Sequence, residues 1–449
     1  MFEPSDLINL VLSTVTARPG AAEAIQATMQ RATEFPSPVQ AQLAGIALHP
    51  AGRALAEHTL DAYWADRSRQ DDLLATASQT REVIIGSGFH AATYAAIRVL
   101  SGFAKPLVLE RGGRAGGTFA MTGHPTFYVN SRNRPGGAGL AGDQGAGLNV
   151  LPGAPIQAAN LSMAEYQTNT DMAVVIRLAL AQFADVITDA EVTAVSGDDR
   201  DVDIDIRGRR ALTAGRLIDA RGVGDPTAKA AANGTSVLTF NPFMQRMAGP
   251  WPLRGVRRAA VIGGGDSGKC AVEALLGIAP PPPLAAAALD HVDRVDWYAE
   301  TLPETCDDWQ NRVRGRYQAI GRYLRPDRFG VQRLTVIDRQ AQPIALPDAV
   351  LIDGRTYDLV VLCTGNREAE IDGLGARSFT AYSLAGDMPV ARKHVGWPVY
   401  RVGPHARLSF TDVEYTTGIA DTPANAVSMF RTGPKTAALA ASLPSTDDI

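Results

Sequence analysis

The sequence predicts an α/β protein built from two similar units, because one succession of elements occurs twice along the chain. In each copy a short apolar run leads into a glycine-rich turn, a helical stretch and a second apolar run. The first copy spans residues 82–110 and the second spans residues 259–300. A further apolar run closes each unit, at residues 217–222 and 358–365. Strands and helices in this order form parallel sheets, so we expect two Rossmann-like dinucleotide-binding domains.

Residues 1–80 differ from the rest of the chain, because they have helical spacing and contain no catalytic motif. We expect a helical N-terminal extension that packs on the main body or on another subunit. In the second case the protein would be a homo-oligomer. Residues 81–250 are expected to form the first part of one dinucleotide-binding domain, and residues 367–449 its second part. Residues 251–366 would form the other domain, inserted between them.

The composition of the 449-residue chain excludes several classes of protein. Its 43 Lys and Arg against 47 Asp and Glu give a net charge of −4, which does not indicate a nucleic-acid partner. The cysteines Cys270, Cys306 and Cys363 stand far apart, which excludes a disulfide framework and a C-x-x-C dithiol site. The histidines show no metal-ligand spacing, so we expect no metal.

The N-terminal residues lack the basic segment and apolar run of a signal peptide. The apolar uncharged stretch at residues 274–289 contains four consecutive prolines and is too short to span a bilayer as a helix. We therefore expect a cytoplasmic protein without a membrane partner.

The first glycine-rich turn, Gly86-Ser-Gly-Phe-His-Ala91, has the pattern of a dinucleotide site. Its first glycine makes a tight turn, its second lets a pyrophosphate approach the backbone, and the small Ala91 allows close packing of helix and strand. The N-terminus of the following helix presents free N–H groups to phosphates. Glu110 ends the next strand, where an acid suits the ribose hydroxyls.

A second glycine-rich stretch follows at residues 112–119 and would lie along a long cofactor, which favours FAD in the first domain over NAD. The expected FAD contacts are Gly86, Gly88, Phe89, Ala91, Glu110, Arg111, Thr118, Asn130 and Gly222.

The second turn, Gly263-Gly-Gly-Asp-Ser-Gly268, repeats the pattern and is expected to bind the nicotinamide nucleotide. No arginine directly follows Glu300 at the end of the next strand, but several arginines lie between residues 312 and 322. One of them could take a 2′-phosphate, which favours NADPH over NADH, although they could equally form a solvated helix face. The expected contacts are Gly263, Gly265, Asp266, Ser267, Gly268, Arg314, Thr364 and Gly365.

The closing run 358–365, Asp-Leu-Val-Val-Leu-Cys-Thr-Gly, resembles the D-x-x-x-(L/F)-A-T-G signature of N-hydroxylating flavoproteins. Cys363 stands in place of the usual Ala and Asn366 in place of the usual Tyr. Together with the paired glycine turns, residues 81–440 resemble the class B flavoprotein monooxygenases with two dinucleotide-binding domains. No F-x-G-x-x-x-H-x-x-x-W stretch precedes the second turn, which favours the N-hydroxylating type over the Baeyer–Villiger type.

Two loops carry a closer resemblance. The segments 127–136 and 425–434 are similar to those of bacterial nitrosuccinate-forming aspartate N-monooxygenases. The resemblance implies a single-component enzyme that uses FAD, NADPH and O2. Hydride would pass from the nicotinamide to the flavin, the reduced flavin would give a C4a-hydroperoxide with O2, and a neutral amine would attack it.

The substrate implied by this resemblance is a small acidic amino acid such as aspartate. The number of oxidations, from hydroxylamine through to a nitroso or nitro compound, stays open. An alternative from the same residues is a flavin-dependent NAD(P)H reductase or oxidase that inserts no oxygen. A third hypothesis, a flavin-bearing interaction protein, predicts no oxidation of NADPH at all.

Arginines suit the two carboxylates of such a substrate, because a planar guanidinium binds a carboxylate bidentately. Arg132 and Arg134 follow the second glycine-rich stretch, and Arg431 lies in the terminal segment that this class packs beside the flavin. These three are the expected catalytic residues, with an ion pair or a helix cap as the alternative for each. His90 is expected near the pyrophosphate, and His124 could move a proton.

Overall fold

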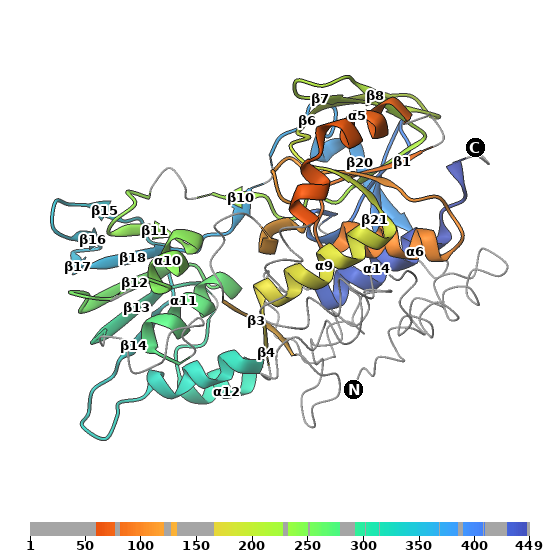
Figure 1. The fold of residues 1–449 in the computed structure, drawn as a ribbon. Coiled ribbons are helices and arrows are strands. Elements are labelled where there is room, and N and C mark those ends of the chain that lie inside the picture. Colours follow the sequence, from red (N-terminus) through yellow and green to blue (C-terminus); the bar gives the residue numbers. More distant parts are fainter. Residues whose placement is uncertain are drawn as a thin grey trace.

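The computed structural model shows two α/β units side by side (Figure 1). It describes residues 60–76, 81–120, 127–132, 166–227, 232–249, 252–278, 292–300, 302–313, 315–367, 369–384, 389–406, 408 and 429–446.

The first unit is centred on a seven-stranded sheet with the order β20-β21-β22-β9-β1-β2-β5. Its strands are β1 (Glu82–Ile85), β2 (Leu107–Leu109), β5 (Asp185–Ile187), β9 (Arg216–Asp219), β20 (Phe379–Ser383), β21 (Pro389–His394) and β22 (Val399–Arg401). The strands from β22 to β5 are parallel, whereas β20 and β21 form an antiparallel edge. The chain therefore leaves this sheet after β9 and returns to it near its C-terminus.

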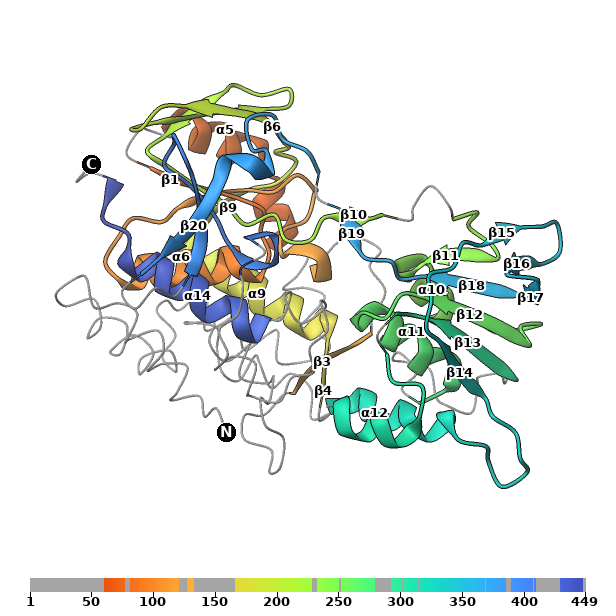
Figure 2. The ribbon, with the colours of Figure 1, turned by 180° about the vertical axis from the view of Figure 1, so that it is seen from behind.

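Alternate residues of β1 face two different apolar layers, as the twofold period of a strand requires. Ile84 faces the layer of α6 (Phe89–Leu100), α9 (Asn169–Phe183) and α14 (Met429–Ser442), which lie along one side of the sheet (Figure 2). Val83 and Ile85 face the opposite layer, which includes a three-stranded sheet. That sheet consists of β6 (Val192–Gly197), β7 (Val202–Ile206) and β8 (Leu212–Ala214).

The second unit has a fully parallel sheet with the order β11-β18-β12-β13-β14. These strands are β11 (Val237–Thr239), β12 (Arg258–Ile262), β13 (Arg294–Tyr298), β14 (Leu334–Ile337) and β18 (Leu359–Leu362). One face packs on α10 (Phe240–Met247), α11 (Asp266–Leu276), α12 (Cys306–Arg312) and the 3-10 helix η4 (Gly315–Leu324). The other face packs on β16 (Val350–Ile352) and β17 (Arg355–Tyr357). The exposed strand β15 (Ile344–Ala345) pairs with β16.

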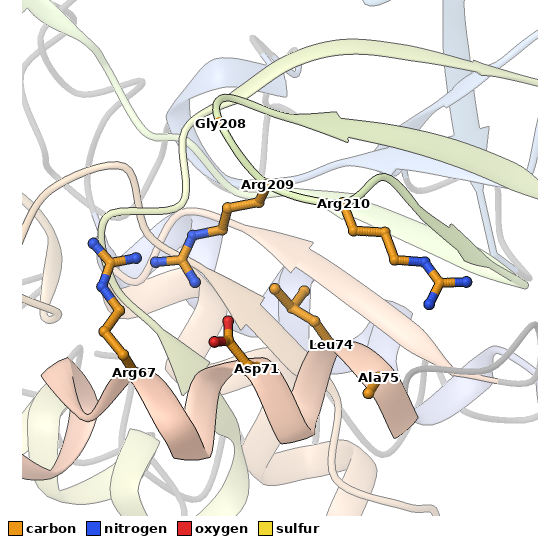
Figure 3. Close-up of a pocket in the computed structure, with 7 residues that line it drawn as sticks. All are labelled: Arg67, Asp71, Leu74, Ala75, Gly208, Arg209 and Arg210. Carbon is orange, nitrogen blue, oxygen red and sulfur yellow. The ribbon is translucent and has the colours of Figure 1, made fainter.

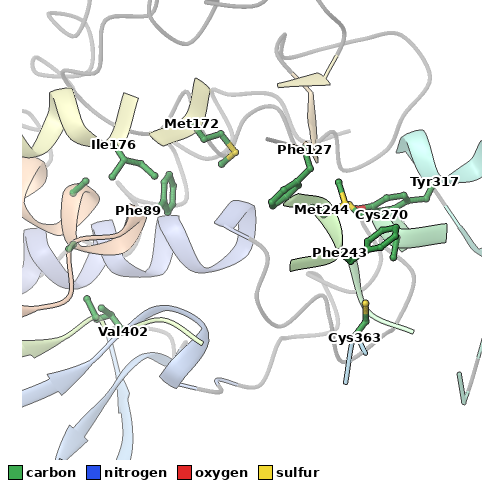
Figure 4. Close-up of a cluster of buried hydrophobic side chains, with 14 of the residues drawn as sticks. Phe89, Phe127, Met172, Ile176, Phe243, Met244, Cys270, Tyr317, Cys363 and Val402 are labelled. Atoms are coloured by element: carbon green, nitrogen blue, oxygen red, sulfur yellow. The ribbon is translucent and has the colours of Figure 1, made fainter. Parts of the chain in front are cut away.

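Two short ribbons and a chain of aromatic rings join the units. The connectors that leave and re-enter the first unit pair as β10 (Asp225–Pro226) and β19 (Asn366–Arg367). A second ribbon pairs β3 (Tyr128–Arg132) with β4 (Tyr166–Thr168). Phe127 directly precedes β3, and its ring meets that of Phe240 in α10 edge-on, with the centroids 5.1 Å apart. Figure 4 shows Phe127 beside Met244 and Cys270 of the second unit.

The predicted fold class is confirmed, since each unit has a parallel sheet with the strand–turn–helix–strand order and the second unit interrupts the first. Of the helical extension, α5 (Arg67–Thr76) is described and packs Leu73 and Leu74 against the first unit. Residues 1–59 and 77–80 of the predicted extension lie outside the described residues. Strand β11 joins the second sheet although it precedes residue 251, where the second domain is predicted to begin. The predicted boundaries of the domains stay a prediction.

Candidate cofactor-binding sites

The first glycine turn closes tightly over the carboxyl ends of three strands. Gly86 follows β1, has a φ of +90° and donates its N–H to the carbonyl of Leu109 in β2 at 2.9 Å. A Cβ on Gly86 would lie 2.9 Å from the carbonyl oxygen of Ala220 and 3.1 Å from the Cα of Arg221, just beyond β9. Only glycine fits both this dihedral angle and this space.

The second glycine-rich stretch lies directly against the first turn. Gly117 has a φ of +70°, and a Cβ there would lie 2.6 Å from the Cα of Gly88. Gly88 is the N-cap of α6 and carries no side chain that could cap the helix, an arrangement that suits the binding of an anion. Phe89 and Ala91 are buried in the first turn of α6, where Figure 4 shows Phe89 on the side of α9.

Ser87 and Glu110 tie the two glycine-rich segments together. The Glu110 carboxylate accepts the Ser87 hydroxyl at 2.5 Å and the N–H of Gly112 at 2.9 Å. The Ser87 oxygen in turn accepts the N–H of Gly116 at 2.9 Å. Oε2 also accepts the N–H of Ser87 at 3.2 Å, so Oε1 is the oxygen that keeps a second lone pair, and contact of Glu110 with a ribose stays a prediction. Sequence reasoning missed Ser87. The sequence feature that could have identified it is a small hydroxyl residue between Gly86 and Gly88.

Arg177 of α9 supports the same segment from behind. Its buried guanidinium donates to the carbonyl of Ala115 at 2.7 Å and pairs with Asp61 at 2.6 Å. It also lies over the ring of Trp64, 5.0 Å from its centroid. The chain that precedes the first sheet thus contacts the first cradle, the name used here for residues 86–91 and 112–117; the second cradle is residues 263–268. An arginine inside a helix has no motif, and the sequence analysis did not single it out.

The other predicted contacts of the first cradle lie at its rim. Arg111 and Thr118 are exposed, Thr118 within the 3-10 helix η1 (Gly117–Ala120). Gly222 follows β9 with a φ of +74°, and no described atom lies within 4 Å of a Cβ placed on it.

His90 connects the start of α6 to the start of α14. Its Nε2 lies 2.6 Å from the Thr432 hydroxyl, and a Cβ on Gly403, in the 3-10 helix η6 (Gly403–Ala406), would lie 2.8 Å from its ring. Burial lowers the pKa of His90 to about 3, so the ring is neutral near pH 7. Thr432 adjoins Arg431, which places the backbone of Arg431 beside the first cradle.

A buried carboxylate organises the end of β9. Asp219 accepts hydrogen bonds from Arg221 at 2.8 and 2.9 Å, from Arg401 at 3.1 Å and lies 3.1 Å from His405 Nε2. Burial alone would raise the pKa of Asp219, but hydrogen bonds and charges from Arg221 and His405 hold it well below its usual range. Arg221 also donates to the carbonyl of Ala369 at 2.6 Å, which fixes the returning connector to this end of the sheet.

The second glycine turn is tighter than the first. Gly263 has a φ of +114°, and its Cβ would lie 2.1 Å from the carbonyl oxygen of Cys363. A Cβ on Gly268 would lie 2.0 Å from the carbonyl oxygen of Gly263. That oxygen also accepts the indole N–H of Trp297 at 2.9 Å. Gly265 is the N-cap of α11, so this helix too starts without a side-chain cap.

The first turn of α11 has exposed residues on one side and is contacted by η4 on the other. Asp266 and Ser267 are exposed, and Lys269 lies 3.4 Å from the Asp266 carboxylate. The hydroxyl of Tyr317, in η4, reaches the carbonyl of Asp266 at 3.4 Å and the sulfur of Cys270 at 3.1 Å. Segment η4, which carries predicted arginines, therefore lies beside the second cradle.

The run 358–365 joins both ends of β18 to their neighbours. Asp358 accepts the backbone N–H groups of Arg257 and Arg258, each at 2.8 Å, which anchors the start of β12. At the other end, Thr227 lies 3.2 Å from the Thr364 hydroxyl and donates its N–H to the carbonyl of Gly365 at 3.1 Å. Thr364 and Gly365 thus lie where the two connectors cross.

The predicted arginines are placed only in part. Arg132 ends β3, Asn130 lies within β3 and Arg431 lies in the first turn of α14, each located by its backbone. Arg134, Arg314 and His124 lie outside the described residues. Within the described part of the chain, no cluster of three or more His, Cys, Asp or Glu is arranged to hold a metal. No helix there has the length and hydropathy to cross a membrane.

No family model matches this chain, and no curated protein matches its sequence. Among solved structures, an ornithine N-hydroxylase from Kutzneria sp. 744, with reduced FAD, NADP+ and L-ornithine, has a TM-score of 0.50 at 16% identity, over 81% of this chain and 98% of that one. A flavin-containing monooxygenase from Stenotrophomonas maltophilia has a TM-score of 0.48 at 17% identity, over 80% and 97%. A thioredoxin reductase from Lactococcus lactis has a TM-score of 0.46 at 14% identity, over 80% and 97%. The first likeness shows that the two units have the fold of this hydroxylase.

Proposed function

We propose that the chain is an FAD- and NADPH-dependent flavoprotein monooxygenase that hydroxylates the amino group of a small acidic amino acid such as aspartate. The observation that carries the proposal is the pair of glycine turns, in which a Cβ on Gly86, Gly117, Gly263 or Gly268 would collide with backbone. Two such turns in one chain provide for two dinucleotides. The ornithine N-hydroxylase of the same fold carries both cofactors and acts on an amino group, which supports this assignment.

The first cradle suits FAD because it combines a turn with a second glycine-rich segment. The start of α6 would hold the pyrophosphate, and Glu110, already fixed by Ser87, would receive the ribose. The segment 112–117 would follow the cofactor toward the centre of the molecule. Bound together, the two cofactors would supply hydride transfer and reaction with O2.

The second cradle would hold NADPH at the start of α11. The neighbouring segment η4 is anchored by Trp309, whose indole N–H donates to the carbonyl of Tyr317 at 3.0 Å. The arginines on and beside η4 would then meet the 2′-phosphate, with Arg314 as the predicted contact. A guanidinium fork suits a phosphate there better than a carboxylate such as Glu300 would.

The acidic substrate would be bound by Arg132, Arg134 and Arg431. The contact of His90 with Thr432 supports this role for Arg431, because it brings the first turn of α14 against the start of α6. His90 stays neutral, so it adds no second positive charge to this place. The arginines would orient the substrate through its carboxylates and leave its amino group free to react.

The purified protein provides the test. We expect a yellow protein whose NADPH oxidation matches O2 consumption and rises with one acidic amino acid in a panel that also contains lysine and ornithine. With 18O2, the product should gain labelled oxygen on nitrogen. Oxidation of NADPH that yields only hydrogen peroxide would instead establish the reductase or oxidase alternative. A colourless protein that takes up neither cofactor would contradict the proposal altogether.

A further inference from the structure

A hollow of about 390 Å³ opens on the first unit between α5 and the turn that joins β7 to β8 (Figure 3). Three arginines line it, Arg67 from α5 and Arg209 and Arg210 from the turn, together with the carboxylate of Asp71 and the apolar side chain of Leu74. None of the cradle glycines belongs to it, so it is separate from the candidate cofactor sites.

Arg67 and Arg210 are exposed and Arg209 is half-buried, and unlike the buried arginines of the first unit none of the three has a carboxylate partner among the described residues. The paired ones are Arg98 and Arg216 with Glu82, Arg177 with Asp61, and Arg221 and Arg401 with Asp219. In the part of the chain that the structure describes, no carboxylate oxygen lies within 4.0 Å of a guanidinium nitrogen of Arg67, Arg209 or Arg210. The fold thus leaves this group of positive charges without a partner.

One of these guanidinium groups is held in place with a donor to spare. Nη2 of Arg209 donates to the amide oxygen of Gln70 at 2.8 Å and to the carbonyl of Thr188 at 3.2 Å. Its other terminal nitrogen, Nη1, is buried and finds no hydrogen-bond partner among the described residues. A buried donor without a partner costs free energy, and an anion in the hollow would recover it by drawing Nη1 outward into contact.

The neighbouring charges work in the same direction. Burial lowers the pKa of Arg209, and the positive charge of Arg67 lowers it further, while Asp71 and Asp189 oppose this only in part. Figure 3 shows the guanidinium groups of Arg67 and Arg209 turned toward each other above Asp71, whereas Arg210 extends away. Three arginines and one aspartate leave a formal charge of about +2 around the hollow, which matches a doubly charged anion.

We propose that this hollow binds a small dianion with oxygen acceptors, either phosphate or a dicarboxylate, between the guanidinium groups of Arg67 and Arg209. The planar group of Arg209, fixed by Gln70 and Thr188, supplies a preorganised donor, and Arg67 closes the site from α5. Because α5 packs on the first unit next to this turn, a bound anion would fasten the helix to the β7–β8 hairpin. The site is independent of the proposed oxygenase activity.

Thermal unfolding of the protein saturated with FAD and NADP+ tests the site. Phosphate or succinate replaces chloride at constant ionic strength, so that the cofactor cradles are filled and general screening is constant. We expect a saturable rise in Tm with one of the two anions, and the one that acts identifies the class of ligand. Arg67→Gln, which removes no hydrogen bond to a described residue, should weaken the apparent affinity about tenfold. Asp71→Asn should strengthen it, because it removes the opposing charge.

The matched control is Arg207→Gln, an exposed arginine on the same hairpin that pairs with Glu191 outside the hollow. It should leave the response of the Tm to the anion unchanged. No saturable rise with either anion would overturn the proposal. An equal rise in the wild type and in Arg67→Gln would do so too, because it would mean that the anions act elsewhere on the protein. The opposite signs expected for Arg67→Gln and Asp71→Asn keep the test independent of any loss of stability in one variant.

Discussion

The hydroxyl of Ser87 bridges two glycine-rich segments, since it donates to Glu110 at 2.5 Å and accepts the N–H of Gly116 at 2.9 Å. Ser87→Ala removes this bridge and should weaken FAD binding by about 1.5 to 3 kcal/mol, the range for a lost hydrogen bond with a charged partner. Titration of the apoprotein with FAD, followed by flavin fluorescence, measures the change. Ser68→Ala, at an exposed position of α5, is the control. Equal FAD affinity in both variants would show that the bridge does not shape the site.

The second cradle leaves no room for a side chain at its first glycine. In Gly263→Ala the new Cβ would meet the Cys363 carbonyl, so we expect NADP+ affinity to fall at least about tenfold, as overpacking costs about 1 to 3 kcal/mol. The flavin content of the purified variant should stay unchanged. Calorimetric titration with NADP+ provides the measurement. Gly375→Ala is the control, because its φ is −64° and its Cβ would touch nothing. If flavin is lost together with NADP+, the two cradles are not separate sites.

Arg431 has an expected role that rests on the proposed function. Arg431→Ala should weaken binding of the acidic substrate by about 2 to 5 kcal/mol if a buried carboxylate loses its partner. Retention of FAD should change little. The KM for the amino acid and the flavin content together report the two effects, with the exposed Arg377→Ala as control. A matching loss of flavin would assign Arg431 to the cofactor instead.

His90 should make stability depend on pH in a definite direction. Its pKa in the folded protein is about 3, below the ordinary 6.5, so the unfolded chain binds the extra proton first as the pH falls. The stability that neutral His90 contributes is complete above pH 6.5 and declines toward pH 3, by up to about 1.4 kcal/mol per pH unit. Urea unfolding between pH 7 and pH 4 measures this slope. His90→Gln should flatten it, and an unchanged slope would mean that other groups cause the acid sensitivity.

The carboxylate of Asp219 holds two arginines at the end of β9. Asp219→Asn leaves the buried charges of Arg221 and Arg401 without their partner, and we expect a loss of about 3 to 5 kcal/mol in unfolding free energy. Asp199→Asn, at an exposed position of the β6–β7 turn, should change stability little. Urea unfolding of both variants at pH 7 gives the comparison. Equal stabilities would show that the cluster contributes nothing net.

The parts of the fold that follow local patterns could be predicted from the sequence. The glycine turns and the strands beside them lie where periodicity and glycine spacing indicate. Strand β11 was missed, because three residues are too few for a periodic signal. It joins the sheet through pairing with β18, more than a hundred residues later in the chain.

Most contacts that shape the candidate site depend on distant partners, and the sequence could not reveal them. Arg177 meets Ala115 across 62 residues, and His90 meets Thr432 across 342. No spacing rule connects such pairs, because only the packing of α9 and α14 on the sheet brings them together. The run 358–365 carried a resemblance that could be read from the sequence, whereas the role of Asp358 as an acceptor for two backbone N–H groups emerged only from the structure.

The close approach of Thr227 and Gly365, 3.1 Å from N–H to carbonyl, has a consequence for how this molecule could be rebuilt. The chain between Thr227 and Gly365, which contains the second unit, thus begins and ends at neighbouring positions beside the first unit. A tight turn of a few residues could therefore replace this inserted segment without stretching the chain. The first unit could be produced as a separate protein in this way, and the second units of other proteins with this fold could be inserted at the same junction.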